Sequence, residues 1–77
     1  MVITVRVFAQ LRERLGFEQR QLELPEAATA TSAWAALTGE DTLPGHVLCA
    51  VNMEYAHGET VLADGDEVAF FPPVTGG

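Results

Sequence analysis

The sequence predicts a single two-layer α+β domain in which helices pack on one face of a mixed sheet. Its 77 residues leave room for one domain only. The spacing of apolar residues alternates between the two-residue period of strands and the wider spacing of helices, in the order strand, helix, strand, helix, then further strands. The first and last predicted strands are both apolar, which indicates that they lie centrally in the sheet.

The first third of the chain predicts a strand, a short helix and a second strand. Residues 2–8 are β-branched or aromatic apart from one arginine, and every second side chain is expected to face the core. These inward residues are Ile3, Val5 and Val7. Residues 9–15 change to helical spacing and are followed by Gly16, a typical helix stop. Residues 19–24 alternate again, and so short a helical segment predicts a hairpin-like connection between the two strands.

The rest of the chain predicts one longer helix and two further strands. Residues 29–38 contain good helix formers behind hydroxyl caps, with Trp34 and Leu37 facing the sheet and Gly39 closing the helix. Residues 40–46 are expected to form a loop. The apolar run 47–51 predicts a buried strand.

The C-terminal part predicts two turns and the last strand. A turn is expected near His57 and Gly58, and residues 60–62 predict a brief edge piece. Residues 63–66 predict a tight turn with Gly65 at positive φ. The last strand covers residues 67–71, with Val68 and Phe70 facing one way and Ala69 and Phe71 the other.

Composition excludes several classes of function. The formal net charge of −7 disfavours binding to a phosphate backbone and favours a basic protein surface as the partner. The only cysteine, Cys49, is incompatible with a disulfide framework or a cysteine metal cluster, and His46 and His57 match no metal-ligand spacing, so we expect no metal site. The chain has no run of 18 apolar residues and no apolar signal core, so the expected location is cytoplasmic.

No catalytic constellation is recognisable within the predicted domain. Cys49 lies in an apolar run without basic neighbours, which favours a buried, inert thiol over a nucleophile. Asp64, Asp66 and Glu67 surround a turn glycine and supply too few ligands for calcium. The sequence also lacks a glycine-rich phosphate loop with its lysine.

What remains is the C-terminus, and the chain divides into a domain over residues 1–71 and an extended tail over residues 72–77. Fully extended, six residues reach about 20 Å. Two prolines stiffen the base of the tail, and Gly76 and Gly77 make its tip slender enough for a narrow tunnel. The tail ends in a charged carboxylate at Gly77. The alternative is a terminus without a function of its own.

Three segments resemble a known family. They are residues 62–77, LADGDEVAFFPPVTGG, residues 8–13, FAQLRE, and residues 50–52, AVN. These segments are similar to the small, sulfur-carrier subunits of molybdopterin synthase, which have a ubiquitin-like β-grasp fold. The resemblance spans the whole domain, although residues 39–46 form a shorter loop than relatives often have.

The resemblance implies a β-grasp domain whose chemistry takes place at its tail. An activating enzyme would adenylate Gly77 with ATP and magnesium, and a sulfur donor would convert the adenylate into a thiocarboxylate. The sulfur would then pass to cyclic pyranopterin monophosphate in the active site of the large subunit, and two such transfers would form the molybdopterin dithiolene. The small subunit would bind no cofactor of its own, and the partners would supply the catalytic acids and bases. The tail residues expected inside the partner's active site are Pro73, Val74, Thr75, Gly76 and Gly77.

The resemblance also implies a heterotetramer, with two small subunits at opposite ends of a large-subunit dimer. The alternation in the first and last strands places Phe8 and Phe71 on the sheet face away from the helices, where two exposed phenylalanines are typical of a partner interface. The alternative is that the helical layer wraps around and buries both rings.

Three other functions stay open. The chain could be a sulfur carrier for another pathway, such as thiamine synthesis or tRNA thiolation. It could be a ubiquitin-like modifier joined to lysines of other proteins through Gly77. It could also be a plain interaction domain with a disordered tail, and removal of Gly76 and Gly77 would distinguish that case because binding would survive.

Overall fold

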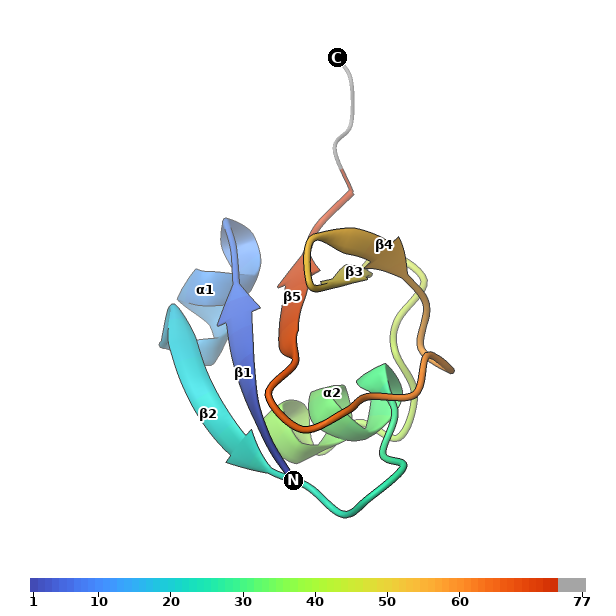
Figure 1. Ribbon diagram of the computed structural model, residues 1–77. Coiled ribbons are helices and arrows are strands. Elements are labelled where there is room, and N and C mark those ends of the chain that lie inside the picture. The colour runs from blue at the N-terminus through green and yellow to red at the C-terminus, as the bar shows by residue number, and fades with distance from the viewer. Residues whose placement is uncertain (74–77) are drawn as a thin grey trace.

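The computed structural model describes residues 1–73, which form one five-stranded sheet and two helices (Figure 1). The elements in chain order are β1 (Val2–Val7), α1 (Gln10–Leu15), β2 (Gln19–Glu23), α2 (Ala30–Thr38), β3 (Leu48–Val51), β4 (Glu54–Ala56) and β5 (Glu67–Phe71). The strand order across the sheet is β2-β1-β5-β3-β4. The predicted α+β class is therefore confirmed.

The two strands from opposite ends of the chain lie side by side inside the sheet. β1 and β5 are parallel, with Val7 opposite Phe70, whereas the β1–β2, β3–β5 and β3–β4 pairs are antiparallel. The sheet is thus mixed, and β5 occupies its centre, as the apolar composition of the first and last strands predicts. The antiparallel β1–β2 pair also confirms the hairpin-like connection around α1.

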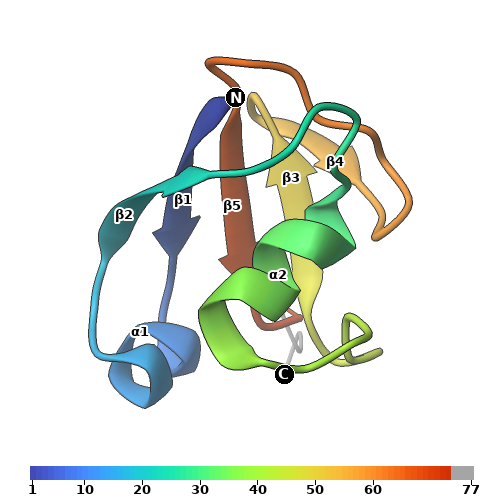
Figure 2. The ribbon, with the colours of Figure 1, turned by 90° about the horizontal axis from the view of Figure 1, so that it is seen from below.

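The core lies between one face of the sheet and α2, which crosses that face (Figure 2). The alternate residues of β1 and β5 predicted to face inward are all buried. Trp34 of α2 is fully buried and packs edge-on against Phe70, with ring centroids 5.1 Å apart. Burying side chains of this size contributes about 1.5–3 kcal/mol each, so this pair anchors the helix to the sheet.

Local signals in the sequence explain where both helices begin and end. Thr29 and Ser32 form a reciprocal capping box at the start of α2. Gly39 ends α2 with a φ of 81°, and Gly16 ends α1 with a φ of 83°, both in the left-handed region that glycine adopts without a steric penalty.

One strand of the sheet is not among those predicted from the sequence. Residues 54–56 form β4, which is paired with β3 through a two-residue turn at Asn52 and Met53. Both turn residues have positive φ, 51° and 70°, as a hairpin turn matching the twist of the strands requires. The Asn52–Met53 pair lacks the glycine that usually marks such a turn, so the sequence predicts only the later turn near Gly58. The brief edge piece at residues 60–62 is confirmed as a single bridge between Thr29 and Val61.

Candidate functional site

The central strand β5 ends at Phe71, and the chain leaves the domain there through Pro72 and Pro73 (Figure 1). The tail therefore starts from the central strand of the sheet, which is hydrogen-bonded on both sides. Four of the tail residues singled out in the sequence lie outside the described residues. They are Val74, Thr75, Gly76 and Gly77.

Phe8 and Phe71 flank the point where the tail begins. Val7 pairs with Phe70 across the parallel strands β1 and β5, and the Phe8 amide donates to the Phe70 carbonyl at 3.2 Å. Because side chains alternate along a strand and Val7 and Phe70 face the core, Phe8 and Phe71 point away from α2. Phe8 is 46% exposed, and Phe71 is half-buried. The helical layer does not wrap around to bury them. Whether a partner covers these rings stays a prediction.

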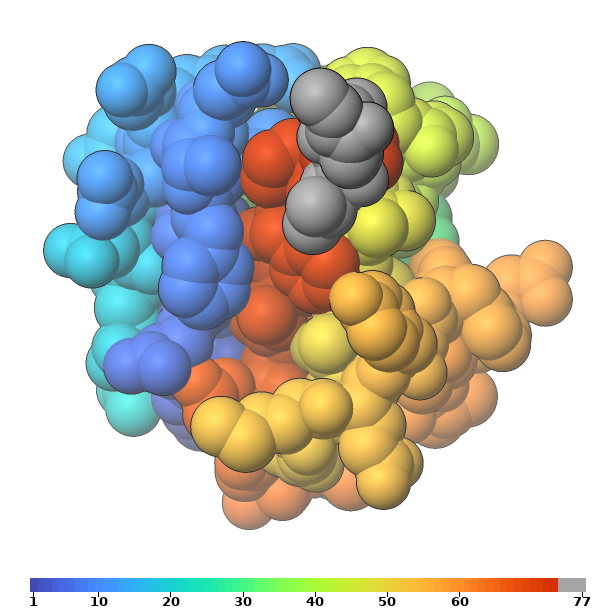
Figure 3. All heavy atoms as spheres, turned by 90° about the horizontal axis from the view of Figure 1, so that it is seen from above, coloured from blue at the N-terminus to red at the C-terminus, as the bar shows by residue number. Residues whose placement is uncertain are grey.

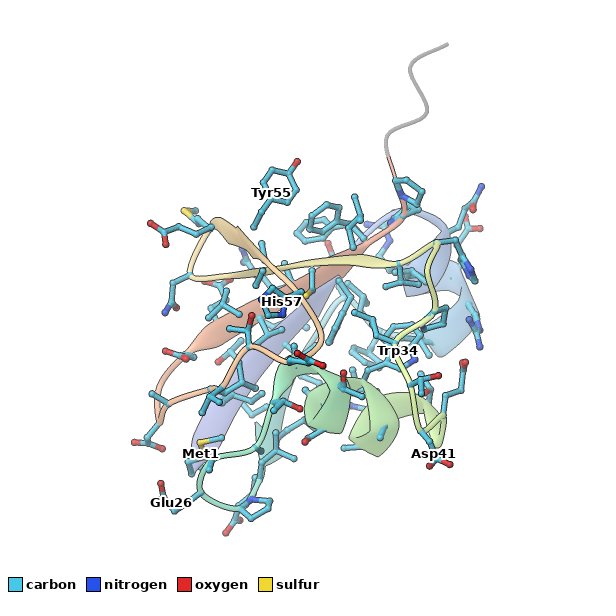
Figure 4. The ribbon with its side chains drawn as sticks, turned by 90° about the vertical axis from the view of Figure 1, so that its right-hand side faces the viewer. Met1, Glu26, Trp34, Asp41, Tyr55 and His57 are labelled. Atoms are coloured by element: carbon cyan, nitrogen blue, oxygen red, sulfur yellow. The ribbon has the colours of Figure 1, made fainter. Side chains whose placement is uncertain are left out.

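A third aromatic residue, which the sequence does not predict to lie here, belongs to the same region. Tyr55 of β4 is 81% exposed, and its ring lies 5.9 Å from that of Phe71 at a tilt of 60°. Figure 4 shows Tyr55 projecting on the side of the molecule from which the tail leaves. The only sequence signal for this placement would have been the β3–β4 hairpin itself, because Tyr55 reaches Phe71 across two strand pairings.

Small and polar side chains occupy the sheet face between these rings, onto which Figure 3 looks. Ala69 of β5 is paired with Ala50 of β3 and with Arg6 of β1. Arg6 Nε lies 3.0 Å from Glu67 Oε1, and it also donates to Gln19 Oε1 at 3.3 Å. This face is therefore apolar near the tail, and the charges it carries there, those of Arg6 and Glu67, are paired with each other.

The acidic turn before β5 has a structural role. Asp66 Oδ2 accepts from the Ala63 amide at 2.8 Å, and Asp64 Oδ1 accepts from the Val2 amide at 2.7 Å. Gly65 has a φ of 85°, as predicted for this turn. These carboxylates accept backbone hydrogen bonds, in agreement with a turn. Among residues 1–73, no cluster of three or more His, Cys, Asp or Glu side chains is arranged to hold a metal ion.

The remaining candidate side chains do not form a catalytic group within the described part of the chain. Cys49 is 1% exposed, and burial raises the pKa of its thiol above the ordinary value of 9.0, which keeps it protonated and unreactive. His46 and His57 are both exposed. His46 lies beside Pro72 and Pro73, however, at the base of the tail.

All four arginines are engaged within the domain. Three form ion pairs, and the fourth, Arg20, stacks over the Phe17 ring with its guanidinium carbon 4.2 Å from the centroid. The pairs are Arg6 with Glu67, Arg12 with Glu18, and Arg14 with Glu40. The carboxylates outnumber the arginines, and the resulting negative electrostatic potential favours a basic partner surface.

The helices of residues 1–73 are all too short, or too polar, to cross a membrane.

Comparison with known proteins agrees with this geometry. Residues 5–77 match the ThiS family. The chain is 42% identical to a molybdopterin synthase sulfur carrier subunit from Escherichia coli K12, with 99% of this chain and 100% of that protein covered. It is similar to the crystal structure of the small archaeal modifier protein SAMP1 from Haloferax volcanii, with a TM-score of 0.86, 31% identity and complete coverage of both chains.

A further solved structure contains a partner. A protein–protein complex of subunits 1 and 2 of the molybdopterin-converting factor from Helicobacter pylori includes a chain similar to this one, with a TM-score of 0.66 and 27% identity over the full length of both chains. These likenesses confirm the ubiquitin-like β-grasp fold and the resemblance noted in the sequence. Since the family match covers nearly the whole sequence, the chain belongs to the ThiS family.

Proposed function

We propose that this chain is the sulfur carrier subunit of a molybdopterin synthase and that it carries sulfur as a thiocarboxylate on Gly77. The observation behind the proposal is that the central strand β5 runs directly into the tail, where Phe71 ends the strand and the half-exposed Phe8 follows the neighbouring strand β1. The relationship to the sulfur carrier subunit of Escherichia coli, at 42% identity, supports the same function.

Activation of the tail overcomes the low reactivity of a carboxylate. A Gly77 carboxylate oxygen attacks the α-phosphorus of ATP in the activating enzyme, with Mg²⁺ bound to the phosphates, and pyrophosphate leaves. Hydrosulfide released from a sulfur donor then attacks the acyl carbon, and the bond from that carbon to the AMP oxygen breaks. The products are AMP and a thiocarboxylate in which one oxygen of Gly77 has been replaced by sulfur.

The sulfur is then delivered in the active site of the large subunit. The thiocarboxylate sulfur forms a bond to a carbon of cyclic pyranopterin monophosphate as the bond from that carbon to an oxygen substituent breaks and that oxygen leaves with a proton. Water then cleaves the acyl–sulfur bond, which restores the Gly77 carboxylate. Two such deliveries form the dithiolene. The partner supplies the acids and bases, so this chain contributes the sulfur and the reach of its tail. Support for a large-subunit partner comes from the Helicobacter pylori complex, and we extend it to an assembly of two small and two large subunits.

The sheet face around Phe8 and Phe71 is the docking surface in this proposal. Its rings stand beside the tail, and an exposed aromatic group of this kind is typical of an interface centre. Tyr55 extends the same surface onto β4. A partner that covers these rings would bring its active site directly over the tail.

The proposal is tested by the intact mass of the chain after incubation with the activating enzyme, ATP, Mg²⁺ and a sulfur donor. Exchange of oxygen for sulfur adds about 16 Da. A reaction without ATP serves as the control and should leave the mass unchanged. The modified chain, mixed with the large subunit and the pterin substrate, should return to its original mass as dithiolene product appears. If no thiocarboxylate forms, or if it forms and is not consumed, the proposed function is wrong.

A second candidate, a protein modifier, is favoured by the 31% identity and the close structural likeness to the small archaeal modifier protein. In that case Gly77 would form an isopeptide bond with a lysine of another protein. The same activated chain, incubated with cell extract, would then give lysine adducts heavier than the unmodified proteins by the mass of this chain less one water. A carrier for thiamine synthesis or tRNA thiolation would instead form the thiocarboxylate but would not discharge it to the large subunit.

A further inference from the structure

A groove of about 360 Å³ lies at the base of the tail. It is lined by Ala9, Gln10, His46, Pro72 and Pro73. The lining comes from three segments far apart in the sequence: the start of α1, the loop before β3 and the residues after β5. None of the ring pairs or ion pairs described above fills it.

The backbone at Ala9 is held in a conformation that normally requires glycine. Ala9 has φ 54° and ψ −129°, and the Leu11 amide donates to the Phe8 carbonyl at 3.1 Å, which closes a tight turn with Ala9 at its second position. A residue other than glycine at this position is strained. What alanine adds over glycine is one methyl group, and Ala9 lines the groove. Backbone strain is commonly retained at binding sites, so the strain at Ala9 suggests that its methyl group contacts a partner.

The length of the tail fixes how closely a partner must approach. The proposed reacting residue, Gly77, stands four residues after Pro73, and four extended residues span at most about 14 Å. Any protein that brings reacting groups to Gly77 must therefore have its surface within that distance of Pro73. The walls of an enclosed active site around the tail would then lie close to the groove beside Pro72 and Pro73.

We propose that this groove receives an apolar side chain from the rim of the large subunit's tail-binding channel. This inference rests on the proposed function, since it assumes that the large subunit receives the tail. Two proline rings and the Ala9 methyl group supply apolar walls, and the Gln10 amide and the His46 imidazole supply hydrogen-bonding groups at the edge. Two lining residues of the groove are chain neighbours of the Phe8 and Phe71 surface, because Ala9 follows Phe8 and Pro72 follows Phe71.

The test fills the groove and leaves the tail intact. Gln10→Trp places a large ring in the groove from an exposed position on α1, and Glu26→Trp is the control, at the end of the molecule away from the tail (Figure 4). The dissociation constant for purified large subunit is measured by calorimetry, and the melting temperature of each variant is recorded. We expect Gln10→Trp to weaken binding at least tenfold and Glu26→Trp to change it less than twofold.

A second pair of variants guards against misfolding of the first. Ala9→Gly removes the methyl group and relaxes the backbone, so it should melt at the same or a higher temperature and yet bind the large subunit several-fold more weakly. His46→Trp fills the groove from the opposite wall and should repeat the effect of Gln10→Trp. Wild-type affinity in a folded groove-filling variant would overturn the inference. Unchanged binding by Ala9→Gly would overturn the contact with its methyl group.

Failure of this inference is distinguishable from failure of the proposed function. If thiocarboxylate forms on Gly77 and is discharged to the large subunit while the groove variants bind normally, the carrier function stands and the groove proposal falls. If no thiocarboxylate forms, the carrier function falls whatever the affinities of the groove variants are.

Discussion

The Asn52 side chain donates from Nδ2 to Asp66 Oδ1 at 3.0 Å, which joins the β3–β4 hairpin to the turn before β5. The same asparagine accepts from the Glu67 amide through Oδ1 at 3.0 Å, and its own amide donates to the Glu67 carbonyl at 2.8 Å. One side chain therefore fixes both the start of the central strand and the hairpin that carries Tyr55. Asn52 has a positive φ, a conformation that asparagine tolerates better than most residues.

Replacement of Asp66 by alanine should destabilise the domain without abolishing its chemistry. The change removes the acceptors for Asn52 and for the Ala63 amide, and the loss should be about 1–2 kcal/mol because the site is partly open to solvent. For a domain of this size each kcal/mol lowers Tm by roughly 4–8 °C. Asp41→Ala, at an exposed loop position, is the charge-matched control. Thiocarboxylate formation well below the lowered Tm should persist, and its loss there would assign Asp66 a functional role.

Deletion of Gly77, or addition of one residue after it, should abolish both adenylation and sulfur transfer. The reacting carboxylate would be displaced by one residue, about 3.5 Å, from the position that the partner enzymes require. The melting curve should not change, because neither variant alters the residues that form the sheet. Intact mass after the activation reaction is the readout. Sulfur transfer by either variant would contradict the assignment of Gly77.

Gly76→Ala should slow sulfur transfer while the fold is unaffected. The added β-carbon needs space where the partner's channel is expected to be narrow, and it disfavours backbone angles open only to glycine. Single-turnover discharge of the thiocarboxylate to the large subunit gives the rate, with Thr75→Ser as a control that adds no atoms to the tail. A rate near that of the wild type would mean that the channel is wide at this position.

Phe8→Ala and Phe71→Ala should each weaken binding to the large subunit at least tenfold, or about 1.4 kcal/mol. They should differ in stability. Phe8 is 46% exposed and its loss should have little effect, whereas Phe71 is half-buried against Tyr55 and its loss should cost about 1–3 kcal/mol of unfolding free energy. Val61→Ala, at an apolar side chain 62% exposed on the edge bridge, is the control. Normal affinity in both phenylalanine variants would remove the predicted interface.

The buried thiol of Cys49 predicts a fall in stability at alkaline pH. Burial raises its pKa in the folded state above 9.0, so the folded state holds the proton more tightly than the unfolded state does. Its contribution is fully present below pH 9 and is lost as the pH rises from there through the folded-state pKa, with a slope of up to about 1.4 kcal/mol per pH unit. Urea titrations from pH 7 to 10.5 on the wild type and on Cys49→Ala measure this. Equal slopes in the two proteins would assign the alkaline loss to other groups.

The parts of the fold that the sequence predicts are those set by local chemistry. Gly16, Gly39 and Gly65 mark turns because glycine alone adopts positive φ without strain, and the structure places all three there. Asn52 and Met53 adopt the same region without glycine because the pairing of β3 with β5 and the bonds to Asp66 and Glu67 hold them in place. Such tertiary support leaves no signal in a local pattern.

The candidate site divides in the same way. Period-two alternation correctly places Phe8 and Phe71 on the face away from α2. The contact of Tyr55 with Phe71 depends on a missed strand, and the groove at Ala9 depends on a strained turn that a propensity argument would reject for alanine. Both features arise from segments brought together only by the complete sheet.

The position of β5 at the centre of the sheet has a consequence for how the chain folds. Val2 and Asp64 are hydrogen-bonded across 62 residues, and β1 finds its parallel neighbour only when residues 67–71 are available. Without them the β1–β2 and β3–β4 hairpins have no strand between them, and Trp34 lacks the ring of Phe70. Folding therefore waits for a contact of high sequence separation, which makes it slow for a domain of this size. During synthesis, the nascent chain cannot close its sheet until the segment that leads into the tail has emerged from the ribosome.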